Sequence, residues 1–466
     1  MDDSTESIAQ LAQQMTVAFK AAVTHHLEAG GKALTMADVE TGMRELLRRI
    51  GMQSLSLFLS TPGETPVAEL PCPCGGRVHY QRQRAATITT VFGRLTYTRA
   101  YYAGCACGQG RAPVDDEYGL EPGGITSGLA ALLGLGGIEF GFEESCRWME
   151  PFLLFRVSEN TVRSETQRLG QLQAEHEKEV CAQSQDEAYL QARLRDTAPV
   201  PKRLYGSLDA AKVRIEPRGK AEEKPENYEK WRDLKVGCWY EAEVVPSAQR
   251  SARQRDKFER EQVVYRAKRI RYYCAIDKAE EFGKLVWGTG CVAKADLAPE
   301  LVFVCDGATW IWDLIAYYYS DALQIVDWYH AADRLQQVAQ VAFATDAERK
   351  VWLERVKDDL WEGHVDPVIR ACEQLATTCE KAREAVTYFT NNASRMKYAQ
   401  YRAAGYLIGS GTVESGCKQI VTQRLKQPGA QWNVGGAVHT AKARAAWLSG
   451  EWDHLCAQRA ALPLAV

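Results

Sequence analysis

The 466-residue sequence has no long apolar run. No segment approaches the roughly 18 to 20 consecutive apolar residues of a membrane-spanning helix, so we expect no membrane span. The N-terminal segment MDDSTESIAQ is acidic and lacks the basic and apolar regions of a secretory signal. The 14 cysteines are spread through apparent core strands and helices and not set as a small disulfide framework, which favours a reducing cytoplasm. Because the formal net charge is only -3, any surface that binds nucleic acid must be local and not a basic coat over the whole molecule.

Acidic residues are absent from two segments that contain many basic residues. Six arginines and no acid lie between Pro71 and Val114, and three lysines and two arginines but no acid lie between Glu414 and Glu451. A local excess of positive charge suits a surface that faces phosphates, although a solvated surface with no partner is the structural alternative. The candidate DNA-binding residues of these two segments are Arg77, Arg82, Arg84, Lys418, Arg424 and Lys426.

The spacing of apolar residues predicts a multi-domain α/β protein. Helical spacing dominates residues 4–58, 125–195 and 331–404, and a β-hairpin is predicted at residues 85–103. Five further strands, separated in part by the charged inserts 216–231 and 249–271, are predicted at 204–215, 235–245, 269–277, 300–308 and 322–330. The predicted segments are an N-terminal helical segment (1–60), a zinc-ribbon-like β-hairpin (61–115), a helix-turn-helix region (116–195), the first part of an α/β core (196–338), an all-helical insertion (339–404) and the final helices of the core (405–466).

Two close pairs of cysteines, in the sequences CPCGG and CACGQ, flank the predicted hairpin. Four thiolates can bind Zn²⁺ tetrahedrally, and a zinc ribbon places its cysteine pairs at the ends of such a β element. Both pairs have one intervening residue, whereas the pairs of zinc ribbons usually have two. Four small, half-buried thiols without a metal are the structural alternative, and His79 could replace one ligand. The predicted zinc ligands are Cys72, Cys74, Cys105 and Cys107.

Residues 142–170 have the pattern of a helix-turn-helix. Apolar residues at helical spacing lie on both sides of a break in the sequence PFLLFRVS, and Ser158 can cap the second helix. In a helix-turn-helix the start of the second helix enters the major groove, so Asn160, Thr161 and Arg163 are candidate DNA contacts. A helical hairpin that only packs is the alternative.

Three carboxylates predict a cation site in the α/β core. Asp209 lies inside an apolar strand, where a charge is costly unless it is paired or bound to metal. Asp306 ends an apolar strand, and the carboxyl ends of strands are where open α/β sheets bind ligands. Glu414 lies in the first turn of a helix whose apolar side would dock on the sheet. Such an oxygen-rich set suits Mg²⁺, and a pair of ions can promote phosphoryl transfer.

Each of these acids also has a structural alternative. Asp209 could pair with Lys212 or Arg214, and Asp306 could cap the helix that follows it. Glu414 could form an i,i+4 pair with Lys418. It is the combination of a strand Asp, a strand-end Asp and a helix Glu that favours a metal site.

Two further candidates lie in the sequence IVDWYHAADRL. Asp327 and His330 are one turn apart at the end of a predicted strand. His330 could bind a DNA phosphate or orient a metal ligand, and Asp327 could be an alternative ligand. A satisfied pair in the core is the structural alternative.

The segments SLDAAKV, VCDGATWIW, IVDWYHAADRL and GSGTVESGCKQIVTQRLKQPGAQW resemble the DDE-type transposases of bacterial insertion sequences, most closely the Kra insertion-sequence family. The cysteine pairs, the hairpin and the segment SENTVR resemble the N-terminal half of that family. The likeness extends over about residues 65–455. It implies an RNase H-like catalytic core with an all-helical insertion, in which the catalytic triad is Asp209, Asp306 and Glu414.

The same resemblance implies a reaction and its partners. It implies cleavage of double-stranded DNA at the terminal repeats of an element and strand transfer of the 3′-OH into target DNA, with two Mg²⁺ ions that Mn²⁺ can replace. Because two ends are joined, we expect a homodimer or a higher homo-oligomer, in the bacterial cytoplasm and at the nucleoid when bound to DNA. The alternatives are a non-catalytic, sequence-specific DNA-binding protein derived from a transposase and a metal-dependent nuclease without strand transfer.

Overall fold

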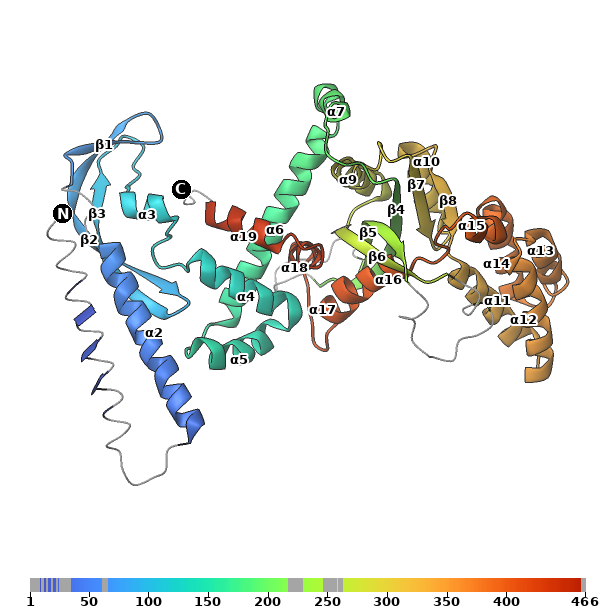
Figure 1. Cartoon of the computed structure of the whole chain (residues 1–466), viewed down its shortest axis with the longest axis horizontal. Coiled ribbons are helices and arrows are strands. Elements are labelled where there is room, and N and C mark those ends of the chain that lie inside the picture. Colours follow the sequence, from blue (N-terminus) through green and yellow to red (C-terminus); the bar gives the residue numbers. More distant parts are fainter. Residues whose placement is uncertain are drawn as a thin grey trace. The chain divides into compact units, whose positions relative to one another are not determined.

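The computed structural model shows a mixed α/β protein with two sheets (Figure 1). The structure describes isolated positions between 9 and 24, Phe258 and residues 35–60, 66–216, 229–245 and 263–461. The early part of the first predicted helical segment, up to residue 34 and apart from the isolated positions, and most of the two charged inserts lie outside these residues. By its internal packing the chain divides into two compact units, residues 1–169 with 453–466 and residues 170–452.

The first unit contains a three-stranded antiparallel sheet. Its order is β1 (Glu69–Pro71), β2 (Arg77–Thr90), β3 (Gly93–Ala103). The hairpin predicted at residues 85–103 is confirmed by the pairing of β2 with β3. Buried and exposed residues alternate along β3, as expected for a strand with one covered face. Helix α2 (Met36–Ser60) packs on β3 and begins with the capping hydrogen bonds between Thr35 and Asp38.

The other helices of the first unit follow the sheet and include the predicted break. Helix α5 ends at Leu153 and α6 begins at Glu159. The two helices and the break predicted within residues 142–170 are therefore present. Leu154 ends α5 in the left-handed conformation, with φ of 60°. The helices are α3 (Pro113–Tyr118), α4 (Ser127–Glu139), α5 (Phe142–Leu153), α6 (Glu159–Gln183), which continues into the second unit, and α19 (Trp452–Ala461).

The second unit contains a five-stranded mixed sheet with the order β6-β5-β4-β7-β8. β6, β5 and β4 are antiparallel neighbours, whereas β4, β7 and β8 are parallel. All five predicted strands are present. They are β4 (Arg203–Arg214), β5 (Trp231–Val244), β6 (Tyr265–Ala275), β7 (Glu300–Cys305) and β8 (Leu323–Val326).

Helices connect the parallel strands and then form a block after β8 (Figure 1). α9 (Ala279–Val292) links β6 to β7, and α10 (Thr309–Tyr318) links β7 to β8. The helical character predicted for residues 331–404 is confirmed. The remaining elements are α7 (Glu187–Leu194), α11 (Trp328–Ala342), α12 (Asp346–Trp361), α13 (Val365–Glu373), α14 (Glu380–Asn392), η2 (Ala393–Arg395), α15 (Tyr398–Ala403), α16 (Gly411–Gly416), the π-helix η3 (Cys417–Thr422), α17 (Gln423–Leu425) and α18 (Val434–Leu448).

Among the helices within the described ranges, none combines the length and the apolar character that crossing a bilayer would demand.

Candidate functional site

The register of the parallel strands brings the predicted aspartates level with one another. Gly206 of β4 pairs with Phe303 of β7, and Cys305 of β7 pairs with Val326 of β8. Neighbouring strands lie about 4.8 Å apart. Continued along the three strands, these registers place three acids in one row across the sheet: Asp209, Asp306 and Asp327.

Asp209 is half-buried, and its two possible cationic partners bind other acids. Lys212 lies 2.9 Å from Asp233, and Arg214 binds Glu216. The Asp209 carboxylate accepts hydrogen bonds from the N–H of Ala210, at 2.7 Å, and from the S–H of Cys417. Burial raises the pKa of the Asp209 carboxyl; these two hydrogen bonds oppose the rise, and the nearby charge of Asp306 adds to it. Asp209 is therefore a half-buried acid next to a like charge.

Asp306 lies in the loop between β7 and α10. Its Oδ1 accepts a hydrogen bond from the N–H of Ala308 at 3.0 Å, but Ala308 is itself the N-cap of α10 and no side chain caps that helix, so Asp306 does not have the capping role considered as an alternative. Its backbone carbonyl accepts a hydrogen bond from the hydroxyl of Tyr388 at 2.9 Å. The guanidinium of Arg334 lies 5.0 Å from the centre of the Tyr388 ring. The backbone at Asp306 is thus fixed from the helical block.

Glu414 is held by an imidazole and a hydroxyl. His330 Nε2 lies 3.3 Å from Glu414 Oε1, and Ser410 Oγ donates to the same oxygen at 2.9 Å. The side chains of His330 and Glu414 are each 46% exposed. The hydrogen bond to Glu414 raises the pKa of His330 to about 9, with Asp327 and Asp306 contributing, and the same bond lowers the pKa of Glu414. These contacts, not the considered pair with Lys418, hold Glu414.

Asp327 is buried at the start of α11. Its two oxygens accept hydrogen bonds from the backbone N–H groups of His330 and Ser410. This geometry matches the structural alternative for Asp327 more closely than the role of a metal ligand. Asp327 and His330 nevertheless lie at the same site as the three predicted acids, because the charges of Asp306, Asp327 and Glu414 all act on His330.

The helix that carries Glu414 docks on the sheet by its apolar side, as the sequence predicts. α16 contacts β4 and β5. The predicted apolar residues of the continuous helical segment formed by α16, η3 and α17 are all buried: Val413, Cys417, Ile420, Val421 and Leu425. The predicted helix is not regular throughout, because residues 417–422 form a π-helix, a feature that is frequent at functional sites.

Arg424, predicted to lie at the surface and bind phosphate, is buried, so that prediction is wrong. Arg424 is 1% exposed, and its guanidinium lies 5.1 Å from the centre of the Trp432 ring. The π-helix shifts the helical phase relative to a regular helix, so Arg424 faces the interior. Lys418 and Lys426 are exposed as expected. Trp432 is buried and donates to the carbonyl of Leu425, so it packs and is not available to an exposed base.

The two basic residues of α18 are also buried. Lys442 binds Glu177 and donates to the carbonyl of Cys274 at 2.8 Å. Arg444 donates to the carbonyl of Gln419 at 2.6 Å. In the acid-free segment after Glu414, the exposed positive charge therefore comes from the lysines near α16.

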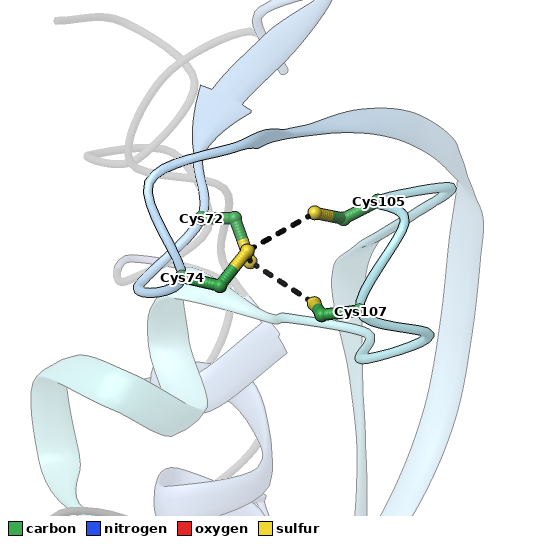
Figure 2. Close-up of side chains that lie close together, drawn as sticks. All are labelled: Cys72, Cys74, Cys105 and Cys107. Atoms are coloured by element: carbon green, nitrogen blue, oxygen red, sulfur yellow. Dashed lines mark hydrogen bonds between the residues drawn. The ribbon is translucent and has the colours of Figure 1, made fainter.

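The four predicted zinc ligands lie together in the first unit. Figure 2 shows their sulfur atoms pointing toward one another from two turns. Cys74 Sγ lies 3.4 Å from Cys72 Sγ and 3.3 Å from Cys105 Sγ, and Cys72 Sγ lies 3.5 Å from Cys107 Sγ. A tetrahedral site with Zn–S bonds of about 2.3 Å has sulfur atoms about 3.8 Å apart. The cluster could therefore bind a structural zinc ion after a small expansion.

Tight turns explain how a spacing of one residue still brings each pair together. The N–H of Gly75 donates to the carbonyl of Cys72, and the N–H of Gly108 donates to that of Cys105, both at 2.9 Å. Both glycines have positive φ, 89° and 75°, which strongly favours glycine. The Gly that follows each pair is thus what closes the turn and directs both thiols inward.

The thiols of this cluster interact strongly with one another. The backbone N–H of Cys107 and the neighbouring thiols lower the pKa of the Cys105 thiol to about 7. Despite a backbone N–H that lowers it, the neighbouring thiols raise the pKa of the Cys72 thiol to about 12. One thiolate therefore forms readily in the cluster, and a thiolate is the form that binds metal. His79 is 59% exposed and lies 3.8 Å from Glu69, and it is not a member of the cluster.

The four cysteines differ from the three carboxylates in how closely their ligand atoms approach. In the described part of the chain, they are the one group of three or more His, Cys, Asp or Glu residues whose ligand atoms all lie within 4.8 Å of one another. Asp209, Asp306 and Glu414 do not form such a group there.

The other predicted DNA-binding residues lie on the first unit. Arg77, Arg82 and Arg84 are exposed; Arg77 pairs with Glu69 at 2.7 Å, and Arg84 lies 4.7 Å from the centre of the Tyr101 ring. At the start of α6, Asn160 is exposed and Thr161 is half-buried. Arg163 is bound to Glu159 and to Asn160, so it would have to exchange these partners to contact DNA.

Three residues at the carboxylate site were not identified from the sequence as site residues. Ser410 lies four residues before Glu414, a spacing that could have indicated the contact. Cys417 was predicted only as an apolar residue of the docking face. Tyr388 lies in the helical block, and nothing in its sequence context points to Asp306.

The carboxylate site therefore combines carboxylate oxygens, a cationic imidazole and exposed lysines, groups of the kinds that bind cations and phosphates. No protein-family model matches the sequence, and a search of curated proteins gives no match.

Proposed function

We propose that this protein is a DNA transposase of the DDE type that cleaves DNA at the ends of an insertion sequence and joins the 3′-OH to target DNA. The observation that carries the proposal is the alignment of Asp209 and Asp306 on neighbouring parallel strands, with Glu414 on a helix docked on the same sheet. The charges of Asp306 and Glu414 both act on His330, and that of His330 acts on Asp209.

The strand order supports an RNase H-like core as the fold of the second unit. Three antiparallel strands, β6, β5 and β4, are followed by the parallel β7 and β8. The helical block α11–α15 then separates β8 from the helix that carries Glu414. An all-helical insertion before Glu414 is what the resemblance to insertion-sequence transposases implies.

The types of donor at the site suit Mg²⁺, although the ligand atoms of Asp209, Asp306 and Glu414 do not all lie within 4.8 Å of one another in the described structure. All three donors are carboxylates, the ligands that Mg²⁺ prefers, and burial with a neighbouring like charge raises the pKa of Asp209. A nearby divalent cation would offset that charge. Asp209, Asp306 and Glu414 would hold two ions, which would supply an activated oxygen nucleophile and stabilise the leaving oxygen.

The other residues of the site position the reacting groups. Ser410 and His330 orient Glu414, and the positive charge of His330 beside Glu414 would attract a phosphate. Lys418 and Lys426 are exposed near α16 and would bind the DNA backbone. Catalysis in this proposal comes mainly from positioning and from stabilisation of charge.

In the same proposal the first unit recognises DNA. The zinc-ribbon-like hairpin presents Arg77, Arg82 and Arg84, and the helix-turn-helix presents Asn160 and Thr161. Both would contact the terminal repeats, with zinc as a structural ion. Because two ends must be joined, a homodimer or a higher assembly would act.

The test compares the wild type with Asp306→Asn on DNA that carries the element ends. We expect joined products with the wild type and Mg²⁺, and a loss of cleavage and joining of about 10³-fold in the variant, because a metal ligand is lost. DNA affinity should stay within about 2-fold of the wild type. Asp313→Asn, an exposed acid of α10, is the matched control and should retain activity.

Other outcomes would favour the alternatives. Hydrolysed ends without joined products would indicate a nuclease. Mg²⁺-independent binding with no cleavage by the wild type, and with equal affinity in Asp306→Asn, would indicate a non-catalytic DNA-binding protein.

A further inference from the structure

Asp327 is a buried carboxylate that receives hydrogen bonds from the starts of two different helices. Its side chain is 0% exposed. Oδ1 accepts from the backbone N–H of His330 at 2.8 Å and caps α11. Oδ2 accepts from the backbone N–H of Ser410, the N-cap of α16, which lies 83 residues further along the chain. One carboxylate therefore links the first turn of α11 to that of α16.

We propose that Asp327 is a positioning residue that clamps α16 to α11 and thereby fixes the place of Glu414. The proposal deepens the proposed function and rests on it, because it assigns to Asp327 the placement of a catalytic carboxylate and not the binding of a metal.

The two residues that Asp327 binds are the same two that hold Glu414. The backbone N–H groups of Ser410 and His330 donate to Asp327. Their side chains, Ser410 Oγ at 2.9 Å and His330 Nε2 at 3.3 Å, both contact Glu414 Oε1. A shift of α16 relative to α11 would break the contact between His330 and Glu414, because these two residues lie on different helices. Ser410 moves with α16 and would keep its contact with Glu414.

Backbone hydrogen bonds fasten the clamp to the sheet. The N–H of Asp327 donates to the carbonyl of Cys305, at the end of β7, at 2.7 Å. The N–H of Trp328 donates to the carbonyl of Ile408 at 2.8 Å. Cys305 directly precedes Asp306, so the clamp relates the strand end that carries one predicted ligand to the helix that carries another.

The energetics explain why a carboxylate, and not another cap, occupies this position. Burial raises the pKa of Asp327, and the N–H groups of Ser410 and His330 oppose that rise. A carboxylate has two oxygens that can each accept from a different donor. A serine side chain offers one oxygen, so it could cap α11 but could not also reach Ser410.

Asp327→Ser therefore separates the cap from the clamp. Serine is a good N-cap, so α11 should keep its first turn. Hydrogen exchange should show the amides of residues 410–416 opening about 10-fold faster than in the wild type, while those of α11 stay within about 2-fold. Mn²⁺ affinity, measured by electron paramagnetic resonance without DNA, should fall about 10-fold, because His330, which contacts Glu414 from α11, would no longer be held in place relative to α16.

The matched control is Thr345→Ala, which removes the N-cap of α12, where the capping hydrogen bonds stay within the helix. It should leave the exchange of residues 410–416 and the Mn²⁺ affinity at the wild-type values. Asp327→Ser with exchange and affinity both within about 2-fold of the wild type would overturn the clamp.

A second pair of variants gives the same comparison if Asp327→Ser does not fold. Ser410→Pro removes the backbone N–H that donates a hydrogen bond to Asp327, whereas Ser410→Ala keeps that N–H and removes only the hydroxyl. The clamp predicts exchange in α16 about 10-fold faster in the proline variant than in the alanine variant, and equal exchange in the two would contradict it.

The readouts also separate this inference from the proposed function. Neither exchange nor Mn²⁺ binding requires DNA joining. If the wild type binds Mn²⁺ but joins no DNA, the proposed function is contradicted, whereas the positioning role of Asp327 is not. Normal joining by the wild type, with unchanged exchange in Asp327→Ser, would remove the clamp alone.

Discussion

The cysteine cluster and the carboxylate site differ in how the chain assembles them. Each cysteine pair lies on one tight turn, and the ligand atoms of the four cysteines all lie within 4.8 Å of one another. The carboxylates come from β4, the end of β7 and α16, and Asp209 and Glu414 are separated by about 200 residues. The first site depends on local backbone geometry, whereas the second depends on the folding of a whole unit.

The two sites also differ in the groups that surround the ligands. The cysteines are held by turns and contact mainly one another. Each carboxylate contacts a different donor: an S–H for Asp209, a backbone N–H for Asp306, and a hydroxyl and an imidazole for Glu414. This difference suits a permanent structural metal at the cysteines and an exchangeable metal at the carboxylates.

The largest effect should come from removing metal from the cysteine cluster. In Cys72→Ser combined with Cys74→Ser we expect zinc content to fall from about one ion per chain to none, with a loss of binding free energy on the order of 10 kcal/mol. Metal analysis by mass spectrometry and thermal unfolding are the measurements. Cys146→Ser, a half-buried cysteine of the same unit, is the control and should keep its zinc. Zinc retained by the double variant would contradict a four-thiolate site.

The next effect contrasts a structural acid with the proposed catalytic one. Glu177 is buried and bound to Lys442, so Glu177→Gln leaves a buried charge without its partner. Breaking a buried pair in this way costs about 3–5 kcal/mol, which denaturant unfolding can measure. Metal binding at the carboxylates should be unchanged in the fraction that folds. A stability equal to that of the wild type would show that the pair contributes little.

Glu414→Gln should reduce activity and leave stability nearly unchanged, which is the opposite of the result expected for Glu177→Gln. We expect DNA cleavage to fall about 10² to 10³-fold, equivalent to roughly 3–4 kcal/mol in the barrier, because a metal ligand is replaced by an amide. The unfolding temperature should change little, since the Glu414 side chain is 46% exposed. Glu384→Gln, an exposed acid of the helical block, is the control. Full activity in Glu414→Gln would remove Glu414 from the proposed triad.

Much of the fold follows from local signals. Apolar runs predicted all five strands of the larger sheet, because buried strands are nearly continuous in apolar residues. The hairpin and the break between α5 and α6 depend on turn and cap residues that lie within a few positions of the elements they end. Asp209 and Asp306 stood out because acids are unusual in apolar strands.

The contacts that complete the carboxylate site could not be predicted in the same way. The hydrogen bond from Ser410 to Asp327 joins residues 83 positions apart, and it exists only once α11 and α16 are both in place. The burial of Arg424 results from a π-helix, whose extra residue changes which side of the helix faces the core. A regular helix was the natural expectation from the spacing, and it placed Arg424 at the surface.

The smallest effect tests how tightly α16 is packed beside the carboxylates. A Cβ added at Gly416 would lie 2.5 Å from Cε1 of Tyr272, which is too close for a real contact. The Tyr272 ring has little room to move, because it is buried and its hydroxyl donates to the carbonyl of Thr412 at 3.2 Å. Gly416→Ala should therefore displace α16 and destabilise the second unit by about 1–3 kcal/mol, measured by denaturant unfolding.

Gly411, in the same helix, provides the matched control for this substitution. A Cβ at Gly411 would meet no atom within 4 Å, so Gly411→Ala should be neutral or stabilising by up to about 1 kcal/mol, because alanine favours the helix. The displacement in Gly416→Ala should also slow DNA cleavage, whereas zinc content should stay unchanged, because the cysteine turns lie in the other unit. Equal stability and equal cleavage in the two alanine variants would mean that α16 can shift without cost, and the carboxylate site would then be less constrained than its hydrogen bonds indicate.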